Sequence, residues 1–207
     1  IVNYCTEHQT SFADIEVEHK NEKGKLWKIA YPTLDKIGEI IIATTRPETM
    51  LGDVAVAVHP DDERYKKLIG TRILLPIVDK EIPIIADEYV DMSYGTGAVK
   101  ITPAHDPNDF EIAKRHDLPI ESIISPEGKM INVPAQFLGL TPVEARARVL
   151  EALEALELRR GETEIEHAVG HCYKCGSVIE PMIKEQWFIK TQSLAQPAID
   201  ALKKEEI

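Results

Sequence analysis

The sequence predicts a mainly β protein of the α+β class, with a closed β-barrel core, peripheral helices and a small stem. Short apolar or alternating segments recur along most of the chain, and Gly, Pro or Asp turns separate them. Because so many short strands need their edges paired or covered, we expect a closed or strongly curved sheet. Helical signals are fewer but well marked, which predicts helices packed outside the barrel.

Strand signals are of two kinds. Residues 11–19 alternate between apolar Phe12, Ile15 and Val17 and acidic neighbours, as a half-buried strand does. Residues 38–45 form an apolar run rich in β-branched side chains, which favours a buried strand. Shorter runs of these kinds predict further strands at Leu26–Tyr31, Asp53–Val58, Arg72–Val78, Ile82–Ile85, Ala98–Thr102, Ile120–Ile124, Thr163–Val169 and Trp187–Lys190.

Helices are indicated by their first residues. Thr141-Pro142-Val143-Glu144 combines an N-cap Thr, a first-turn Pro and an acid at the third helical position, ahead of a stretch that ends near Leu158. Asp106-Pro107 opens a second helix that runs to about residue 115. We expect two more helices, from residue 60 to Gly70 and from about residue 194 to 204.

Length and charge limit the function. The chain has 207 residues, enough for one sizeable domain, and a formal net charge of −11. That charge argues against a broad nucleic-acid surface, because binding phosphates needs clustered Lys and Arg, so any RNA contact must be local. No apolar run approaches the roughly 20 residues that cross a bilayer. We therefore expect a soluble protein without a membrane partner.

The N-terminal residues carry no targeting signal. The chain begins Ile1-Val2-Asn3-Tyr4, without the basic and apolar regions of a secretion signal and without an initiating Met. We expect a piece of a longer cytoplasmic protein.

The first polar motif is the run Thr44-Thr45-Arg46-Pro47-Glu48-Thr49-Met50-Leu51-Gly52-Asp53. An apolar strand delivers hydroxyls, a guanidinium and a carboxylate onto a turn, which is where binding groups collect on a rigid scaffold. Taken alone, the run is equally well explained as a polar loop with an Arg–Glu surface pair.

The second motif is the run Tyr94-Gly95-Thr96-Gly97-Ala98-Val99-Lys100-Ile101-Thr102-Pro103-Ala104-His105-Asp106-Pro107-Asn108-Asp109-Phe110. Its glycines allow a ligand to approach the backbone, and its strand carries Lys100 and Thr102 toward a helix N-terminus. The alternative is structural. Asp106 has the position of an N-cap and Asp109 that of a first-turn acid, and a lone His105 is more often a hydrogen-bonded structural residue than a base.

Both motifs closely resemble the insertion found in valyl-, isoleucyl- and leucyl-tRNA synthetases, and the resemblance covers nearly the whole chain. They are similar to the two walls of that family's editing pocket. The run from Lys100 to Phe110 is similar to valyl members, since isoleucyl members tend to have Gly after the His. Gln186-Trp187-Phe188-Ile189-Lys190, after a Cys-x-x-Cys, points the same way. The resemblance implies a barrel-type editing domain that removes wrongly attached threonine from tRNA(Val).

The resemblance also implies roles for individual residues. A mischarged ester presents an ammonium, and Asp109 is its natural partner through a charge-assisted hydrogen bond. Tyr94 is placed to stack on the terminal adenine of tRNA, a contact worth roughly 1–3 kcal/mol. The full expected site comprises catalytic Asp109, Lys100, Thr45 and Arg46, with substrate-binding Thr44, Thr49, Tyr94, Thr102, His105 and Asp106.

The expected chemistry needs no cofactor. We find no Ser-His-Asp triad or metallohydrolase motif, and an activated ester requires neither, so we assign no general base. Positioned water and hydrogen bonds to the developing oxyanion are sufficient to catalyse hydrolysis. A synthetic site sized for valine cannot strongly reject its near-isostere threonine, so a second site has to select the hydroxyl.

Two pairs of residues predict a structural zinc site. Cys172-Tyr173-Lys174-Cys175 and Cys5-Thr6-Glu7-His8 each have two intervening residues, the spacing of a knuckle with three thiolates and one imidazole. The family's insertion leaves and re-enters its parent through adjacent strands, which implies that the pairs meet. The alternative is a degenerate, metal-free site, and His171 is a candidate substitute ligand.

We expect three regions: N-terminal stem strands over 1–30, the editing barrel over 31–160, and a returning stem with a C-terminal helix over 161–207. The chain has neither His-Ile-Gly-His nor Lys-Met-Ser-Lys-Ser, so it should not activate amino acids. The expected partners are the acceptor end of tRNA(Val), its threonyl ester and the rest of the parent synthetase with its Rossmann catalytic domain. The alternatives are an isoleucyl- or leucyl-type editing domain and a non-catalytic module that docks the tRNA acceptor end.

Overall fold

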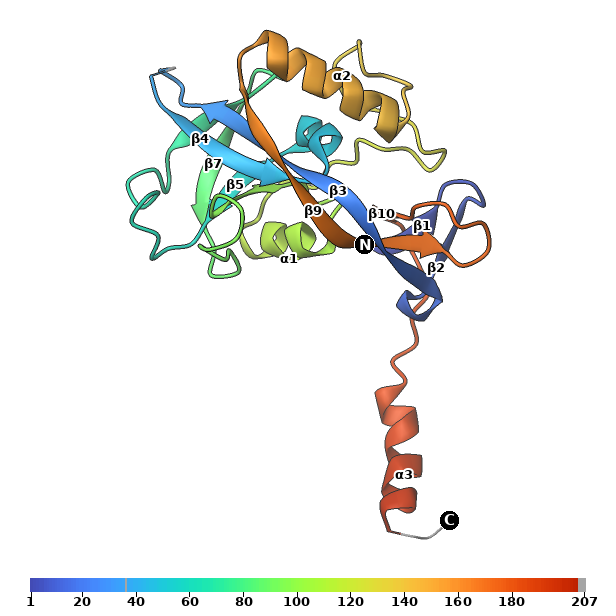
Figure 1. The fold of residues 1–207 in the computed structure, drawn as a ribbon. Helices are drawn as coiled ribbons and strands as arrows, with labels where there is room; N and C mark the ends of the chain where they lie inside the picture. Colours follow the sequence, from blue (N-terminus) through green and yellow to red (C-terminus); the bar gives the residue numbers. More distant parts are fainter. Residues whose placement is uncertain (36, 205–207) are drawn as a thin grey trace.

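The computed structural model describes residues 1–35 and 37–204, so residue 36 and the end of the predicted returning stem at 205–207 lie outside the description. A rounded body holds most of the elements, and a single helix, α3, projects from it at the end of an extended segment (Figure 1). In the described part, none of the helices has the length and apolar character needed to span a membrane.

The elements follow one another in a mainly β order. In sequence, the described residues form β1 (Val2–Cys5), β2 (Thr10–Phe12), the 3-10 helix η1 (Asp14–Glu16), β3 (Val17–Pro32), β4 (Glu39–Thr44), the 3-10 helix η2 (Pro47–Gly52), β5 (Ala55–Val58), β6 (Arg72–Leu75), β7 (Lys80–Ala86), β8 (Ala98–Ile101), α1 (Pro107–Arg115), α2 (Pro142–Ala155), β9 (Arg159–Cys172), β10 (Glu180–Met182) and α3 (Gln192–Lys203).

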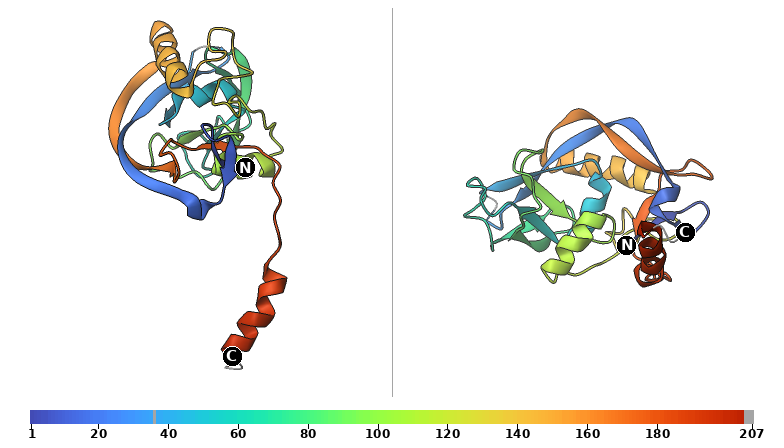
Figure 2. Two further views of the ribbon diagram at one scale, coloured as in Figure 1. Left: turned by 90° about the vertical axis from the view of Figure 1, so that its right-hand side faces the viewer. Right: turned by 90° about the horizontal axis from the view of Figure 1, so that it is seen from below.

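The strands form three sheets. The orders are β10-β1-β2, β4-β3-β9 and β6-β7-β5-β8. The longest pairing joins β3 to β9 antiparallel, from Val17 opposite Cys172 to Ile29 opposite Arg159. Figure 2 shows these two strands curving together around one side of the body. Their far ends therefore bring the first and last thirds of the chain together beside the small sheet of β1, β2 and β10.

The predicted closed barrel is wrong for the described residues. One isolated bridge, Thr33 to Ile73, joins the second sheet to the third, and β4 lies against β8 without a hydrogen-bonded ladder between them. The cause is the composition of the long ribbon. Residues 18–25 of β3 are mostly charged and almost all exposed, so that half of the strand, which pairs with residues 164–171 of β9, has no apolar face to bury in a barrel.

The core lies between the second and third sheets and under α2. Strand β4 alternates, so Ile40, Ile42 and Thr44 are buried while the residues between them are less so. A second cluster packs α1, through Ile112, against Val54 and Ile101. The threonine-rich run thus leaves the core on a buried strand, and α1 is fixed beside the end of β8.

Three of the predicted helices are confirmed. Asp106 caps α1 by accepting from the backbone of Asn108 and Asp109, and Thr141 caps α2 in a capping box with Glu144. The predicted helix at 60–70 is wrong. Those residues form successive turns, because the Asp62 side chain accepts from the Arg64 backbone and so competes with helical hydrogen bonding.

Some strand predictions also fail. Residues 14–16 form η1 rather than a continuous strand, residues 120–124 contribute only an isolated bridge at Ile124, and residues 187–190 form no strand. Trp187 is fully exposed, so its apolar run lacks the neighbouring strand that β structure needs. Strands β1 and β10 were not predicted, because strands of three or four residues give almost no periodic signal.

Candidate active site

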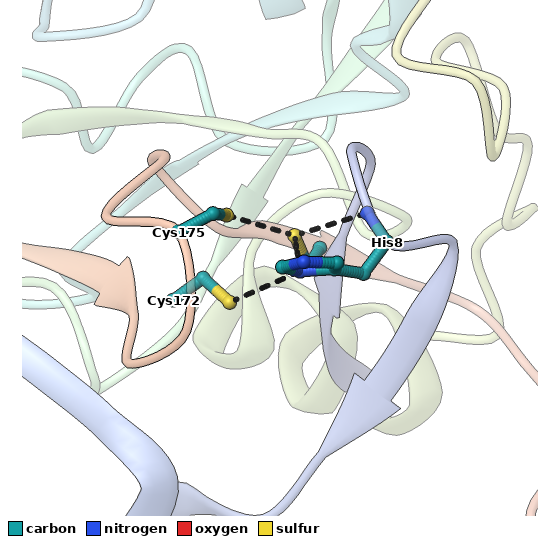
Figure 3. A group of neighbouring side chains, drawn as sticks. His8, Cys172 and Cys175 are labelled. Carbon is teal, nitrogen blue, oxygen red and sulfur yellow. Dashed lines mark hydrogen bonds between the residues drawn. The ribbon is translucent and has the colours of Figure 1, made fainter.

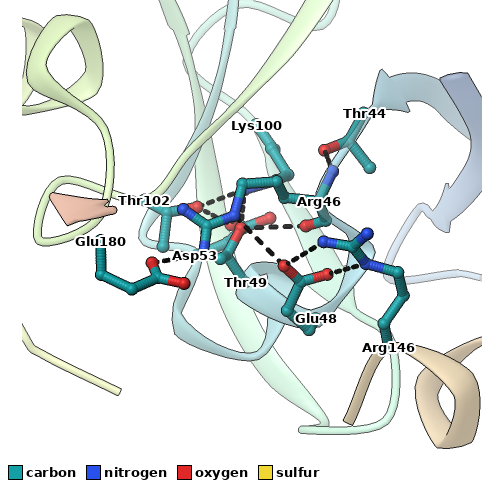
Figure 4. A network of polar contacts seen from close by, with 9 residues as sticks. All are labelled: Thr44, Arg46, Glu48, Thr49, Asp53, Lys100, Thr102, Arg146 and Glu180. Carbon is teal, nitrogen blue, oxygen red and sulfur yellow. Dashed lines mark hydrogen bonds and ion pairs between the residues drawn. The ribbon is translucent and has the colours of Figure 1, made fainter. Parts of the chain in front are cut away.

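The two polar motifs meet where β4 and β8 lie side by side. Thr44 ends β4 and η2 follows, while Lys100 on β8 and Thr102, directly after β8, lie at the same point. Figure 4 shows the resulting network of hydrogen bonds and ion pairs, in which most members are buried.

Lys100 lies at the centre of the network. Its ammonium Nζ donates to Thr49 Oγ1 at 2.8 Å, to Asp53 Oδ1 at 3.3 Å and to Thr102 Oγ1. A lysine ammonium has three hydrogens, so these contacts use them all. Thr49 in turn donates to the Arg46 carbonyl at 3.0 Å. In this arrangement Lys100 supplies positive charge to the site rather than a free hydrogen-bond donor.

Asp53 is the counter-ion of Lys100 and is fully buried. Its Oδ1 accepts from Thr102 Oγ1 at 2.5 Å and its Oδ2 accepts from the Tyr31 hydroxyl at 2.6 Å. Burial raises the pKa of Asp53, against the opposing effects of Lys100, Thr102 and Tyr31. Burial and the neighbouring Asp53 also hold the pKa of Tyr31 well above its usual value.

Asp109 lies in the first turn of α1 and is 7% exposed. Its Oδ2 accepts from the Thr102 backbone N–H at 2.8 Å, while Oδ1 has no hydrogen-bond partner among residues 1–35 and 37–204. Burial raises its pKa to about 7, with Asp106 and Asp53 adding to the rise and Lys100 and the Thr102 N–H opposing it. The structure therefore keeps one oxygen of a buried carboxyl available.

Arg46 joins the network to more distant parts of the chain. Its Nε donates to Glu48 Oε1 at 3.2 Å and its Nη2 donates to Glu180 Oε2 at 2.7 Å. Glu48 is fully buried and also accepts two hydrogen bonds from Arg146 of α2. Burial alone would lower the pKa of Arg46, but Glu180 and Glu48 outweigh it and raise that pKa.

Four expected site residues lie outside this network, namely Thr45, Tyr94, His105 and Asp106, the last of which is the N-cap of α1. His105 is buried, and its Nε2 accepts from the Ile123 backbone N–H at 2.9 Å. Burial and the charges of Arg46 and Lys100 lower its pKa to about 3, with the Pro181 carbonyl and Glu48 opposing them, so the ring is neutral near pH 7. Thr45 is partly buried at the end of β4 and makes no side-chain hydrogen bond within the described residues.

Tyr94 stands on an exposed loop above β4, and 63% of it is accessible. Gly95 and Gly97 shape this loop with φ angles of 61° and 75°, which favour glycine. A Cβ on Gly95 would lie 3.1 Å from the Ala43 side chain, so glycine also allows the loop to approach β4. The Tyr94 ring is accordingly free to contact a ligand.

The two predicted metal-binding pairs come together (Figure 3). The ligand atoms of Cys5, His8, Cys172 and Cys175 all lie within 4.8 Å of one another. Cys5 Sγ is 3.6 Å from Cys175 Sγ and 3.4 Å from His8 Nδ1. His171 is outside this group, because its ring contacts Glu22 and the Val169 carbonyl. The four side chains form a group that is able to hold a metal ion.

Several members of the network were not predicted as site residues from the sequence: Tyr31, Glu48, Asp53, Arg146 and Glu180. Glu48 and Asp53 belong to the threonine-rich run, so the sequence places them near the other residues of that run. It does not show that both side chains are completely buried. Tyr31, Arg146 and Glu180 are distant in sequence and carry no motif. Only the pairing of strands and the docking of α2 place them at the site.

Known aminoacyl-tRNA synthetases are similar to this chain in sequence. A family model described as "Leucyl-tRNA synthetase, editing domain" matches residues 67–143. Valine–tRNA ligase of Carboxydothermus hydrogenoformans is 54% identical over 201 residues, which are 97% of this chain and 23% of that protein. Valine–tRNA ligase of Fusobacterium nucleatum is 51% identical over 207 residues, which are 100% of this chain and 23% of that protein. The chain is a valyl-type editing domain of the class I aminoacyl-tRNA synthetase family.

The fold of this editing domain is also similar to a solved structure. LeuRS, the agnB2 protein of Agrobacterium radiobacter K84, was solved as a ternary complex with tRNA and LeuAMS. It matches with a TM-score of 0.54 at 17% identity, over 80% of this chain and 24% of that chain. At that identity the likeness concerns the fold alone. The chain spans about a quarter of the length of the valine–tRNA ligases it matches.

Proposed function

We propose that this editing domain hydrolyses the ester bond of threonine wrongly attached to tRNA(Val). The observation that carries the proposal is Asp109, a buried carboxyl with one unpaired oxygen among the described residues, beside threonine hydroxyls and the Lys100 ammonium. That oxygen is suited to the ammonium of an aminoacyl ester, which would form a charge-assisted hydrogen bond with it.

The proposed mechanism relies on position rather than on a general base. Asp109 anchors the ammonium, and Lys100 contributes positive charge near the oxygen on which negative charge develops. Arg46, Thr44 and Thr45 hold the ribose and the ester carbonyl. Water then attacks the ester carbonyl carbon, and because these groups fix its position, the entropic part of the barrier is lowered. The bond between this carbon and the ribose oxygen breaks, and the ribose hydroxyl of tRNA leaves with the proton that the water gives up.

Selection of threonine over valine follows from the polarity of the site. The buried hydroxyls of Thr49 and Thr102 form hydrogen bonds within the network. The hydroxyl of a bound threonine could replace one partner in these hydrogen bonds, whereas valine has no hydroxyl and could not. A site that hydrogen-bonds a substrate hydroxyl discriminates against the analogue that lacks it. In the same proposal, Tyr94 stacks on the terminal adenine, and His105 and Asp106 hold the wall that carries Asp109.

The partners in this proposal are the acceptor end of tRNA(Val) and the rest of a cytoplasmic synthetase, including its Rossmann catalytic domain. We propose that residues 31–160 contribute most of the pocket and that residues 1–30 and 161–207 form the stem. Two other functions remain as alternatives, namely editing of an isoleucyl or leucyl type and docking of the tRNA end without hydrolysis.

We also propose that Cys5, His8, Cys172 and Cys175 bind a structural zinc ion. Two thiolates on a tetrahedral zinc lie about 3.8 Å apart, given Zn–S bonds of about 2.3 Å. The 3.6 Å between Cys5 Sγ and Cys175 Sγ fits that spacing. The His8 backbone N–H also donates to Cys5 Sγ at 3.4 Å, which favours the thiolate form of the ligand. Zinc supplies a cross-link in the stem and takes no part in hydrolysis.

A comparison of three substrates tests the function. The full chain is mixed with threonyl-tRNA(Val), valyl-tRNA(Val) and valyl-tRNA(Ile), and release of each amino acid is followed. We expect rapid release of threonine only. Rapid hydrolysis of valyl-tRNA(Ile) would indicate an isoleucyl-type domain, and binding of all three without turnover would indicate a docking module.

A further inference from the structure

The returning strand β10 contacts the polar network through one charged side chain. Glu180 lies on β10, and its carboxylate reaches the guanidinium of Arg46, which is 134 residues away in sequence (Figure 4). The contact is 2.7 Å long, and the Glu180 side chain is only 11% exposed. A buried carboxylate with a short contact to an arginine forms a stronger hydrogen bond than a surface pair.

Glu48 and Glu180 together fix the orientation of the Arg46 guanidinium. Glu48 accepts from Nε and Glu180 accepts from Nη2. Arginine has five N–H donors in one rigid plane, so two acceptors at different nitrogens define that plane. Within residues 1–35 and 37–204, Nη1 has no hydrogen-bond partner, and it is the edge of the guanidinium left for a ligand.

The two carboxylates are held in different ways. Glu48 follows Arg46 by two residues and is itself clamped by Arg146. Glu180 depends on the stem, since β10 pairs with β1 and places Tyr4 opposite Glu180. The position of Glu180 is therefore set by strands that lie outside the region carrying the two motifs.

We propose that Glu180 is a positioning residue for the editing reaction, which aims Arg46 at the bound ester and makes the returning strand part of the pocket. This inference rests on the proposed function. Without Glu180, Arg46 keeps its pair with Glu48 but can rotate about it, so the edge that carries Nη1 is no longer fixed.

The test compares Glu180→Gln with Glu166→Gln in the full chain. Glu166 is an exposed carboxylate on β9, so its substitution controls for loss of one charge from the stem. Steady-state deacylation of threonyl-tRNA(Val) is measured for both, and the Nε–H resonance of Arg46 is followed by NMR after assignment with Arg46→Lys. For Glu180→Gln we expect kcat/KM to fall about tenfold or more and the Arg46 resonance to shift. Glu166→Gln should change neither.

Two results would overturn the inference. One is Glu180→Gln turnover within about twofold of the unsubstituted chain. The other is slower turnover with an unmoved Arg46 resonance, since Glu180 would then act on general stability rather than on Arg46. If Glu180→Gln does not fold, Glu180→Asp replaces it. The shorter side chain should shift the resonance and slow turnover partially, and unchanged behaviour in both measurements would contradict the proposal.

Failure of the proposed function gives a different pattern. In that case the unsubstituted chain releases no threonine from threonyl-tRNA(Val), whatever residue stands at position 180. Failure of the inference alone leaves the unsubstituted chain active.

Discussion

At the scale of single residues, the site combines buried charges that balance one another. Lys100 and Asp53 form a buried pair, and each has further hydrogen bonds to hydroxyls. Asp109 differs, because one of its oxygens lacks a partner within the described residues and its pKa is raised to about 7. The pair holds the polar network together, and Asp109 is the group that we propose binds the ligand.

Ionisation of the Asp109 carboxyl should lower the stability of the fold as the pH rises. Its folded pKa of about 7 lies above its usual value near 4, so the folded chain binds more protons than the unfolded chain between these pH values. The free energy of unfolding therefore falls as the pH rises from about 4 to about 7. Above that range Asp109 is ionised in both the folded and the unfolded chain, so it causes no further change. We expect Asp109→Asn to melt at or above the temperature of the unsubstituted chain at pH 8, with a smaller difference at pH 4. Thermal melts at both pH values check this, and a large loss at pH 8 would show that the carboxylate stabilises the fold.

The Lys100–Asp53 pair should show strong coupling in stability. Lys100→Met leaves Asp53 buried without its counter-ion, which should cost about 3–5 kcal/mol of unfolding free energy. Adding Asp53→Asn removes the unpaired charge and should recover a large part of that loss. Urea denaturation of the two single variants and the double variant measures the coupling. Additive losses would mean that the two charges do not interact as the structure indicates.

At the scale of elements, the positions of the strand ends bring the residues of the two motifs together. Strand β4 delivers Thr44 and η2, β8 delivers Lys100, and α1 begins with a capped turn that carries Asp109. The N-cap role weighed for Asp106 from its position is present, since its carboxylate accepts from the Asn108 and Asp109 backbone. The cap and the candidate ligand-binding carboxyl thus belong to the same turn.

The Cys/His group should stabilise the stem. Cys172 is buried at the end of β9, and Cys5 ends β1. If zinc binds there, the chain should hold about one equivalent of zinc, and Cys172→Ser should lose it and increase hydrogen exchange in β1 and β10 while sparing the core around Ile42. Ser177→Ala is the control, because Ser177 contacts Cys5 and Cys175 without belonging to the ligand group. A metal-free chain whose melting curve is unchanged by added zinc would rule out this role.

At the scale of the whole molecule, the sequence predicts individual helices and strands better than it predicts whether the sheets close into a barrel. Caps and apolar runs located α1, α2 and β4, and two motifs pointed to the residues that meet at the site. The prediction of a closed barrel was wrong, because strand alternation shows which face is buried and does not show which edges pair. Glu180 and Tyr31 could not be assigned either, since single residues distant in sequence give no pattern until β1, β3 and β10 are in place.

The most direct test of the central claim is single-turnover deacylation of threonyl-tRNA(Val) by the full chain and by Asp109→Asn. The substitution keeps the size and the acceptor for the Thr102 N–H but removes the charge that holds the ammonium. We expect hydrolysis to slow by about 100-fold or more while the melting temperature is retained, because the ester is no longer fixed for attack by water. Near-normal hydrolysis by Asp109→Asn would contradict the account, because Asp109 would then be only a first-turn acid of α1.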